Sequence, residues 1–289
     1  MRMFSRIGRL LAGLSLFAAS AALAEVPLAL RGEPAPGSLM IGKTDPSARV
    51  LLGEQPLKVD SDGWFVFGFG RDDSGKHTLV VESGSERLER VLQLTPRDWS
   101  VQYIEGVPQE TVTPPPERLA RIRAEAALVR EARATDSSLS FFRDTFSWPL
   151  AAPITGVYGS QRVYNGTPKR PHFGVDLAAP VGTPVYAPAG GKVTLAHPDM
   201  FYSGGTLLLD HGLGVSSTFI HLHRIHVKEG DMVAQGQLIG EVGKSGRATG
   251  AHLDWRINWF AERLDPQWFL GGTGLDVISE DMVVKQRKQ

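Results

Sequence analysis

The first third of this chain alternates apolar and polar residues with a period of two. Between Glu25 and about Pro96 the alternation comes in short runs such as 63–68 and 77–82, with Asp-Gly, Ser-Gly and Pro-Gly pairs between them. This pattern indicates short antiparallel strands joined by tight turns. We therefore expect residues 25–97 to form a small β-sandwich with an immunoglobulin-like arrangement.

A helical pattern separates this region from a second β-rich one. After the triple proline 114–116, residues 117–134 are rich in Ala, Arg, Glu and Leu with apolar side chains near one stripe, which predicts a helix. We assign residues 98–140 to a linker that contains this helix. Short apolar runs and glycine-rich turns return in residues 141–272 and predict an antiparallel β domain. Residues 273–289 form a polar tail, and the expected fold class is mainly β.

The first residues have the pattern of an export signal. Three arginines precede an apolar run at residues 10–19, and Ala22-Leu23-Ala24 offers a small-x-small cleavage site. We expect residues 1–24 to be a signal peptide cleaved after Ala24, which gives a periplasmic or secreted protein with no stable membrane span. The alternative is an uncleaved anchor helix, but the apolar run is shorter than the roughly 20 residues that a span needs.

Charge and cysteine content narrow the chemistry. The 289 residues carry 31 Lys plus Arg and 31 Asp plus Glu, and residues 1–24 hold three of the arginines and no acidic residue. The mature chain would therefore have a small net negative charge and no basic excess to hold nucleic acid. Because the chain has no cysteine, it has neither a disulfide framework nor a thiol nucleophile, and metal sites fall to His and carboxylates.

Four short segments in the second half concentrate such residues. They are His172-Phe-Gly-Val-Asp176, Phe219-Ile-His221, Gly246-Arg-Ala-Thr-Gly250 and His252-Leu-Asp254. A fully extended strand would separate residues 172 and 176 by about 13 Å, but Gly174 permits a bend that brings their side chains together. Alternation places His252, Asp254 and Arg256 on one face of a strand and apolar residues on the other. The combination indicates a metallohydrolase site.

These segments, together with the phrase Val227 to Gly240, resemble the M23 family of zinc metallopeptidases, the lysostaphin-like or LytM-type domains that cut peptide bonds in bacterial peptidoglycan. The resemblance extends from about Phe146 to Phe269. It implies a LytM/lysostaphin-like peptidase domain that holds one zinc ion per chain. The implied metal ligands are His172, Asp176 and Asp254, and the implied catalytic residues are His221 and His252. The two histidines would orient the attacking water and stabilise the oxyanion.

One position departs from the family pattern. Most members have His-x-His where this chain has His252-Leu253-Asp254. A carboxylate can also bind zinc. However, two Asp and one His cancel the charge of a divalent ion, whereas two His and one Asp leave one positive charge. We therefore expect a weaker Lewis acid in this chain.

The resemblance also implies substrate and partners. The residues expected near substrate come from their positions in the chain: Tyr158, Arg162 and Arg170 precede His172 in one loop, and His223 follows His221 by two residues. Arg162 or Arg170 would clamp a carboxylate of a peptidoglycan stem; the alternative is an exposed loop arginine. The expected function is an exported zinc endopeptidase that acts on peptidoglycan cross-links or stem peptides, with a periplasmic regulator as a further partner. The alternative is a non-catalytic domain of the same fold that binds murein or activates another hydrolase.

A third interpretation comes from a different class of protein. Residues 182–188 and 227–237 resemble the halves of lipoyl or biotinyl carrier barrels. Such barrels need an acceptor lysine at a hairpin tip between the halves. The stretch between Lys192 and Lys228 contains no lysine, which argues against a carrier.

Overall fold

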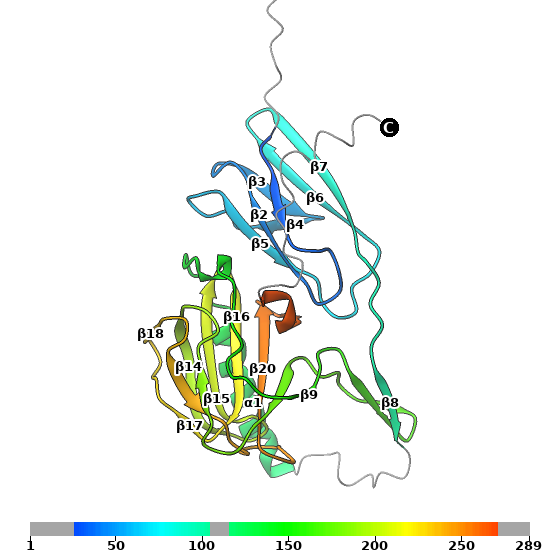
Figure 1. The fold of residues 1–289 in the computed structure, drawn as a ribbon. Helices are drawn as coiled ribbons and strands as arrows, with labels where there is room; N and C mark the ends of the chain where they lie inside the picture. Colours follow the sequence, from blue (N-terminus) through cyan, green and yellow to red (C-terminus); the bar gives the residue numbers. More distant parts are fainter. Residues whose placement is uncertain (1–25, 105–115, 271–289) are drawn as a thin grey trace, which may run out of the picture.

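The chain folds into two β-rich halves. A computed structural model describes residues 26–104 and 116–270. Figure 1 shows the strands of residues 29–93 above and the larger half, residues 141–270, below. The signal peptide predicted for residues 1–24 and the tail 273–289 lie outside the described residues. No helix among the described residues is long and apolar enough to cross a membrane.

The upper half contains two antiparallel sheets, with strand orders β1-β2-β5 and β4-β3-β6-β7. The strands are β1 (Ala29–Arg31), β2 (Leu39–Lys43), β3 (Arg49–Leu52), β4 (Gln55–Leu57), β5 (Trp64–Gly68), β6 (Lys76–Ser83) and β7 (Glu86–Gln93). Apolar side chains from both sheets, among them Phe65, Phe67, Leu79 and Val81, lie in one buried cluster. The period-two alternation of the sequence accounts for this one-sided burial. An immunoglobulin-like arrangement of these strands stays a prediction.

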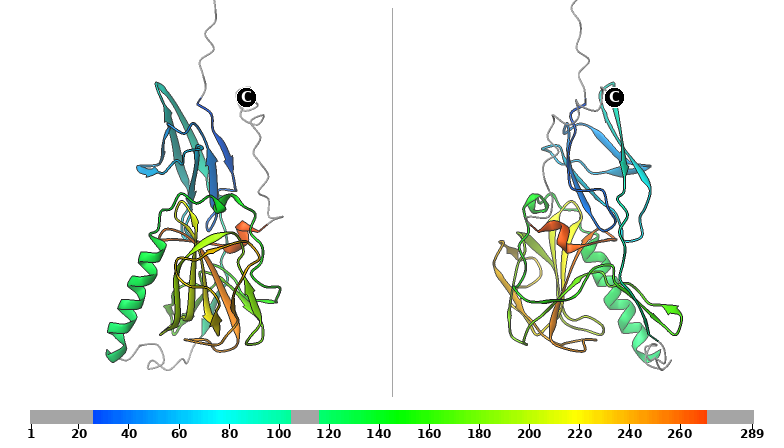
Figure 2. Two further views of the ribbon diagram at one scale, coloured as in Figure 1. Left: turned by 90° about the vertical axis from the view of Figure 1, so that its left-hand side faces the viewer. Right: turned by 45° about the vertical axis from the view of Figure 1, so that its right-hand side comes forward.

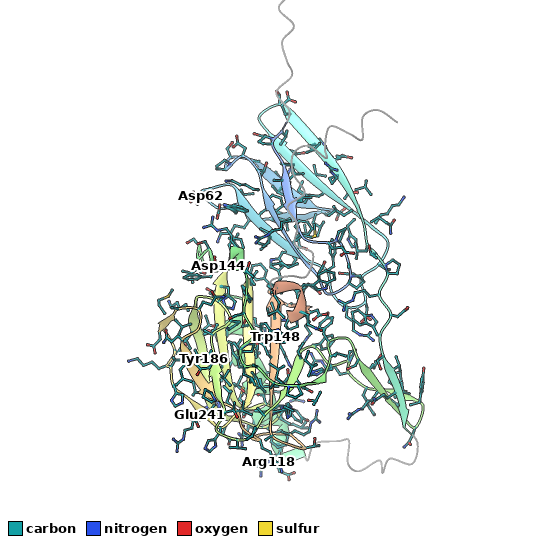
Figure 3. All side chains as sticks on the ribbon, in the orientation of Figure 1. Asp62, Arg118, Asp144, Trp148, Tyr186 and Glu241 are labelled. Atoms are coloured by element: carbon teal, nitrogen blue, oxygen red, sulfur yellow. The ribbon has the colours of Figure 1, made fainter. Side chains whose placement is uncertain are left out.

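A strand and a helix connect the two halves. β8 (Val101–Ile104) pairs in parallel with β10 (Gln161–Tyr164), which in turn pairs with β11 (Thr167–Pro168). The 3-10 turn η2 (Pro116–Arg118) leads into α1 (Leu119–Arg133), and a second turn, η3 (Phe141–Arg143), follows. Figure 3 places Arg118 at the bottom of the lower half and Asp144 at its top, next to the upper half. Figure 2 shows that α1 runs between these two ends along the side of the sheet.

The lower half is built on an eight-stranded antiparallel sheet of order β18-β14-β15-β16-β20-β12-β9, with β21 also paired to β20. Its strands are β9 (Ile154–Gly156), β12 (Val175–Ala178), β14 (Gly191–Met200), β15 (Gly204–Gly212), β16 (Val215–Leu222), β18 (Met232–Val233), β20 (His252–Trp259) and β21 (Glu262–Leu264). A smaller sheet consists of β13 (Pro184–Tyr186), β19 (Leu238–Glu241) and β17 (Arg224–Ile225). Leu253, Trp255 and Ile257 are fully buried on one face of β20. The predicted mainly β fold is confirmed.

The opposite face of this sheet carries the polar residues of β20. Antiparallel partners point to the same side, and the register pairs Leu208 with Thr218, Thr218 with Arg256, and Asp254 with Asp176. α1 covers the β14–β15 part of this face, where Leu195, Met200 and Leu208 pack against Val129 and Ala132 of the helix. The β16, β20 and β12 part lies beside the helix, and we call it the groove face.

The two halves pack directly on each other. Arg97 forms an ion pair with Asp265 at 2.9 Å, and Arg71 donates from Nε to the carbonyl of Gly159 at 2.8 Å. A Cβ on Gly68 of the upper half would lie 2.7 Å from Leu264 of the lower half. A single buried hydrophobic cluster includes residues of both halves, so apolar packing as well as charge holds them together.

One buried histidine, His211, is expected to make the stability of the fold depend on pH. His211 is fully buried, its Nδ1 is 2.7 Å from the carbonyl of Gly190, and its Nε2 is 2.8 Å from Oγ of Ser217. Because a carbonyl can only accept, Nδ1 carries a proton. Burial lowers the pKa of His211 to about 4. In the unfolded chain this histidine takes up its second proton near pH 6.5, so the stabilisation is complete above that pH and is lost as the pH falls toward 4.

We expect the loss to reach about 3 kcal/mol near pH 4. Thermal unfolding of wild type, His211→Gln and the exposed-site control His223→Gln between pH 7.5 and 4.5 measures it. Wild type and control should lose stability together, and His211→Gln should show a flatter pH dependence. An equal slope in all three proteins would contradict the role of His211.

Candidate metal centre and active site

His172 and Asp176 lie together at the start of β12. The chain bends at Gly174 before the strand begins, and the Nε2 of His172 is 3.2 Å from the Oδ1 of Asp176. Both atoms are buried, and neither has a hydrogen-bond partner. Buried polar atoms without partners are rare in folded proteins. Their arrangement is that of two ligands facing a common ion.

Two glycines make room for the carboxylates. A Cβ on Gly174 would lie 2.3 Å from Oδ1 of Asp254, and a Cβ on Gly156 would lie 2.3 Å from Oδ2 of Asp176. Gly174 is not one of the residues with a positive φ, so its backbone angles alone do not require a glycine. The sequence suggested that glycine is needed here to bend the chain, and the structure adds the close approach of a neighbouring carboxylate as a second reason.

Asp254 faces Asp176 across the β12–β20 pair and is buried. Both of its carboxylate oxygens accept from the guanidinium of Arg256, with Nε to Oδ1 at 2.9 Å. Burial raises the pKa of Asp254, but the charge and hydrogen bonds of Arg256 outweigh burial and hold the pKa below its ordinary value. Asp254 is therefore an ionised carboxylate with a cation beside it.

The three side chains suit a divalent metal. His172, Asp176 and Asp254 each offer a ligand atom, and these atoms lie within 4.8 Å of one another. Atoms bound tetrahedrally to one zinc are about 3.4 Å apart, close to the 3.2 Å between His172 and Asp176. A carboxylate oxygen has two lone pairs, so an oxygen of Asp254 can face an ion while it accepts from Arg256.

Arg256 changes the charge expected at this centre. The sequence counted two aspartates and one histidine, which cancel a divalent ion. The structure adds the cation of Arg256, so that Asp254 and Arg256 form a neutral pair. The ligand set then contributes one net negative charge, as two histidines and one aspartate would. The weaker Lewis acid expected from the sequence no longer follows.

His221 lies beside this cluster in an unusual backbone conformation. Its φ is 66°, a left-handed value that costs on the order of 1 kcal/mol or more in a residue other than glycine. The backbone N–H donates to Ser203, and Nδ1 lies 2.8 Å from the carbonyl of Ser245. Nδ1 therefore carries the proton and Nε2 is free to accept one. Burial lowers the pKa of His221, which keeps the ring neutral.

His252 completes the group. Its ring centroid is 4.8 Å from that of His221, and its Nδ1 is 2.9 Å from the carbonyl of Gly250. This bond again assigns the proton to Nδ1. The Nε2 of His252 lies 3.9 Å from Oδ1 of Asp176. With each Nδ1 donating to a backbone carbonyl, His221 and His252 both present their Nε2 atoms next to the candidate metal ligands. Their catalytic roles stay predictions.

The four residues predicted to contact substrate have different surroundings. Arg170 lies over the Phe173 ring, 5.6 Å from its centroid, beside the groove face. Arg162 is exposed on β10 and donates to Gln102 of β8. His223 lines a separate pocket with Leu222, Arg224 and Ile225. These three roles stay predictions.

The role near substrate that the sequence predicted for Tyr158 needs a correction. Its side chain is 2% exposed, and its hydroxyl donates to the carbonyl of Arg263 at 2.7 Å. The ring packs edge-on against Trp99 at a centroid distance of 5.6 Å. The hydroxyl and the ring are both used in packing near the junction of the two halves. Tyr158 therefore holds structure together and does not offer a group to substrate.

Sequence reasoning missed Ser245, Arg133 and Arg263 as site residues. The carbonyl of Ser245 fixes the proton of His221, and its Oγ accepts from the N–H of Gly205 and donates to the carbonyl of Leu222. Arg133, the last residue of α1, donates to Oγ1 of Thr218 on the groove face at 3.2 Å. Arg133 and Arg263 reach the site only through the fold, and no local sequence pattern marks them.

A change at Arg256 is expected to alter metal binding. Arg256→Gln removes a positive charge next to the three candidate ligands, and we expect zinc to bind on the order of 10-fold more tightly. Competition against a chromophoric chelator measures the dissociation constant. Arg247→Gln, an exposed arginine over the ring of Tyr202, is the matched control. Weaker zinc binding in Arg256→Gln would show that Arg256 positions Asp254 more than it opposes the ion.

Comparison with known proteins agrees with this geometry. The model described as Peptidase family M23 matches residues 170–266, a range that holds all five residues of the site. The chain is similar to a crystal structure from Pseudomonas aeruginosa assigned to peptidase M23, with 30% identity and a TM-score of 0.64, and the match covers 83% of this chain and 96% of that one.

Two curated relatives match a shorter part of the chain. Peptidoglycan DD-endopeptidase ShyA of Vibrio cholerae is 42% identical over 89 residues, which is 30% of this chain and 20% of that protein. DD-carboxypeptidase/endopeptidase Mpg of Neisseria meningitidis serogroup B is 43% identical over 91 residues, or 31% and 21%. The matched part therefore spans about a fifth of the length of these relatives.

The fold and site define a β-sheet domain with a His/Asp/Asp cluster and two adjacent histidines. The similarity along nearly the whole Pseudomonas structure places the rest of the chain with it. The chain belongs to peptidase family M23, as the resemblance of its motifs predicted.

Proposed function

We propose that this protein is an exported zinc endopeptidase that hydrolyses peptide bonds in peptidoglycan cross-links or stem peptides. The observation that carries the proposal is the cluster of His172, Asp176 and Asp254 within 4.8 Å, with His221 and His252 beside it. Relatives named peptidoglycan DD-endopeptidase and DD-carboxypeptidase/endopeptidase support the substrate class. Export rests on the signal sequence proposed for residues 1–24.

The side chains divide the work of amide hydrolysis. His172, Asp176 and Asp254 would hold the zinc ion, which, when bound, polarises the scissile carbonyl and makes water more acidic. The Nε2 atoms of His221 and His252 accept and return protons, because each Nδ1 is fixed by a backbone carbonyl. Once protonated, either ring can donate to the oxygen that becomes negative as the carbonyl turns tetrahedral.

Digestion of cell walls tests the proposal. The mature chain is incubated with purified sacculi, and the released fragments are analysed by mass spectrometry. We expect uncross-linked stem peptides that gain one water per cut, with intact glycan strands. A chelator should stop the release, and added zinc should restore it.

A binding or activator role is the outcome to distinguish. Arg256 occupies both oxygens of Asp254, and a pair too stable to accept an ion would leave the domain without catalysis. Sacculi that are bound and never cut by zinc-loaded protein would favour that role. Cutting that depends on zinc would exclude it.

A further inference from the structure

Three arginines from three separate segments lie near Arg256. They are Arg133 at the end of α1, Arg170 before β12 and Arg263 in β21. Arg263 is paired with Asn258, which follows Arg256 by two residues on β20, so the register puts Arg256 and Arg263 on one face. We call these four residues the arginine cluster.

Aromatic and hydroxyl contacts hold the cluster in place. The guanidinium groups of Arg170 and Arg263 both lie over Phe173, at 5.6 and 4.7 Å from its ring centroid. Arg133 donates to Thr218, which is the register partner of Arg256. The Nε of Arg133 is buried and has no hydrogen-bond partner. A buried donor without a partner is costly, and a ligand would satisfy it.

The cluster has more positive than negative charge. Burial, and then the neighbouring Arg263, Arg256 and Arg170, lower the pKa of Arg133 to about 9. Burial and the same kind of repulsion lower the pKa of Arg263 to about 10. Arg133, Arg170 and Arg263 have no ion-pair partner in residues 26–104 and 116–270.

The carboxylates nearby are already bound or point away from the cluster. Asp72 and Asp73 line a pocket with Arg263, but Asp72 pairs with Arg71, and Asp73 accepts from the N–H of Gly70. Asp254 is already bound by Arg256 through both oxygens, and Asp176 faces His172 at the candidate metal centre. Glu262 precedes Arg263 and pairs with Trp259, so it points to the opposite face of the sheet. The excess of cations therefore faces the groove.

We propose that the arginine cluster is a subsite for a free carboxylate of the peptide substrate, an inference that rests on the proposed function. Guanidinium forks match carboxylates in a bidentate geometry, and Arg256 already holds the carboxylate of Asp254 in this way. A single carboxylate would meet several forks at once and would satisfy the buried Nε of Arg133.

The register also sets the distance between this carboxylate and the bond that is cut. Arg256 is two residues along β20 from Asp254, and Arg263 lies opposite Asn258, four residues from Asp254. Two to four residues along an extended strand place these arginines about 7 to 13 Å from Asp254. An extended peptide advances about 3.4 Å per residue, so the carboxylate belongs about two to four residues from the scissile bond.

Two peptides that differ in one group test the subsite. One is a peptidoglycan stem peptide with a free C-terminal carboxylate, and the other is the same peptide with a C-terminal amide. Calorimetry with zinc-loaded full-length His252→Gln measures binding without turnover. We expect the acid to bind at least about 10-fold more tightly than the amide, with a preference that weakens in high salt.

Variants of the arginine cluster test whether these residues cause the preference for the acid over the amide. In the same background, Arg133→Gln should lower the affinity for the acid about 10-fold and leave that for the amide unchanged, and Arg133→Lys should recover part of the loss. Arg130→Gln, an exposed arginine on the same helix, is the matched control and should bind like the parent. Arg263→Gln is the second test of the cluster if Arg133→Gln does not fold.

The outcomes separate this inference from the proposed function. Equal affinity for acid and amide overturns the subsite, as does a preference for the acid that survives both Arg133→Gln and Arg263→Gln. Sacculi that are cut without any preference for the acid keep the function and remove the subsite. A preference for the acid that is lost in Arg133→Gln, with no cutting of sacculi by wild type, keeps the subsite and removes the function.

Discussion

Alanine in place of His172 or Asp176 is expected to remove zinc and abolish hydrolysis. Each change leaves two of the three candidate ligands, and two protein ligands are too few to hold the ion. Elemental analysis should fall from about one zinc per chain to less than about 0.1. Release of stem peptides from sacculi should fall to the background seen with chelator.

The controls for this prediction separate metal loss from unfolding. Asp176→Asn keeps the size of the side chain and removes its charge, so it should lower zinc content with the fold intact. His226→Ala removes an exposed histidine paired with Glu241 and should keep full metal and activity. Full zinc content in both His172→Ala and Asp176→Ala would show that the ion is held elsewhere.

Loss of His221 or His252, the two residues proposed to transfer protons, is expected to lower kcat by about 10² or more while zinc stays bound. The left-handed φ of 66° at His221 affects the choice of variant, because asparagine tolerates that conformation better than alanine does. His221→Asn and His252→Gln are therefore the informative changes. Zinc content, thermal stability and turnover of sacculi are measured for each.

The acid side of the activity profile gives a second measurement. Burial lowers the pKa of His221, so this ring stays neutral and able to accept a proton as the pH falls below the ordinary 6.5 of histidine. Activity that depends on His221 should accordingly persist below pH 6.5.

The two variants give the outcome that would contradict this role. If turnover in both His221→Asn and His252→Gln stays within about 3-fold of wild type, proton transfer by these side chains is ruled out.

The sequence contained enough local information to place the strand β20 and its two faces. The alternation of Leu253, Trp255 and Ile257 with His252, Asp254 and Arg256 is the same in the sequence and in the structure. The family motifs then selected the five residues that the fold brings together. A period-two pattern shows which residues share a face of a strand. On β20 the polar face is the one that carries the candidate site residues.

Other features depend on contacts between distant segments. Nothing around Arg133 in the sequence shows that the end of α1 reaches Thr218. Nothing in the sequence shows that the hydroxyl of Tyr158 donates to the carbonyl of Arg263, because the two residues are far apart along the chain. The neutral pair of Asp254 and Arg256 was visible as two residues on one face, but its bidentate geometry depends on burial in the folded state.

That pair also constrains the order in which mutations can occur. Asp254→His alone would leave the buried cation of Arg256 beside a metal with no carboxylate to receive it. Loss of Arg256 alone would leave two carboxylates that cancel the charge of a divalent ion, and so a weaker Lewis acid. Each single step disturbs the charge at the ion, whereas the two together restore it. A lineage that exchanges histidine for aspartate at residue 254 would therefore cross a fitness valley unless residue 256 changes with it, and an engineer who wants the His-x-His form should alter both positions at once.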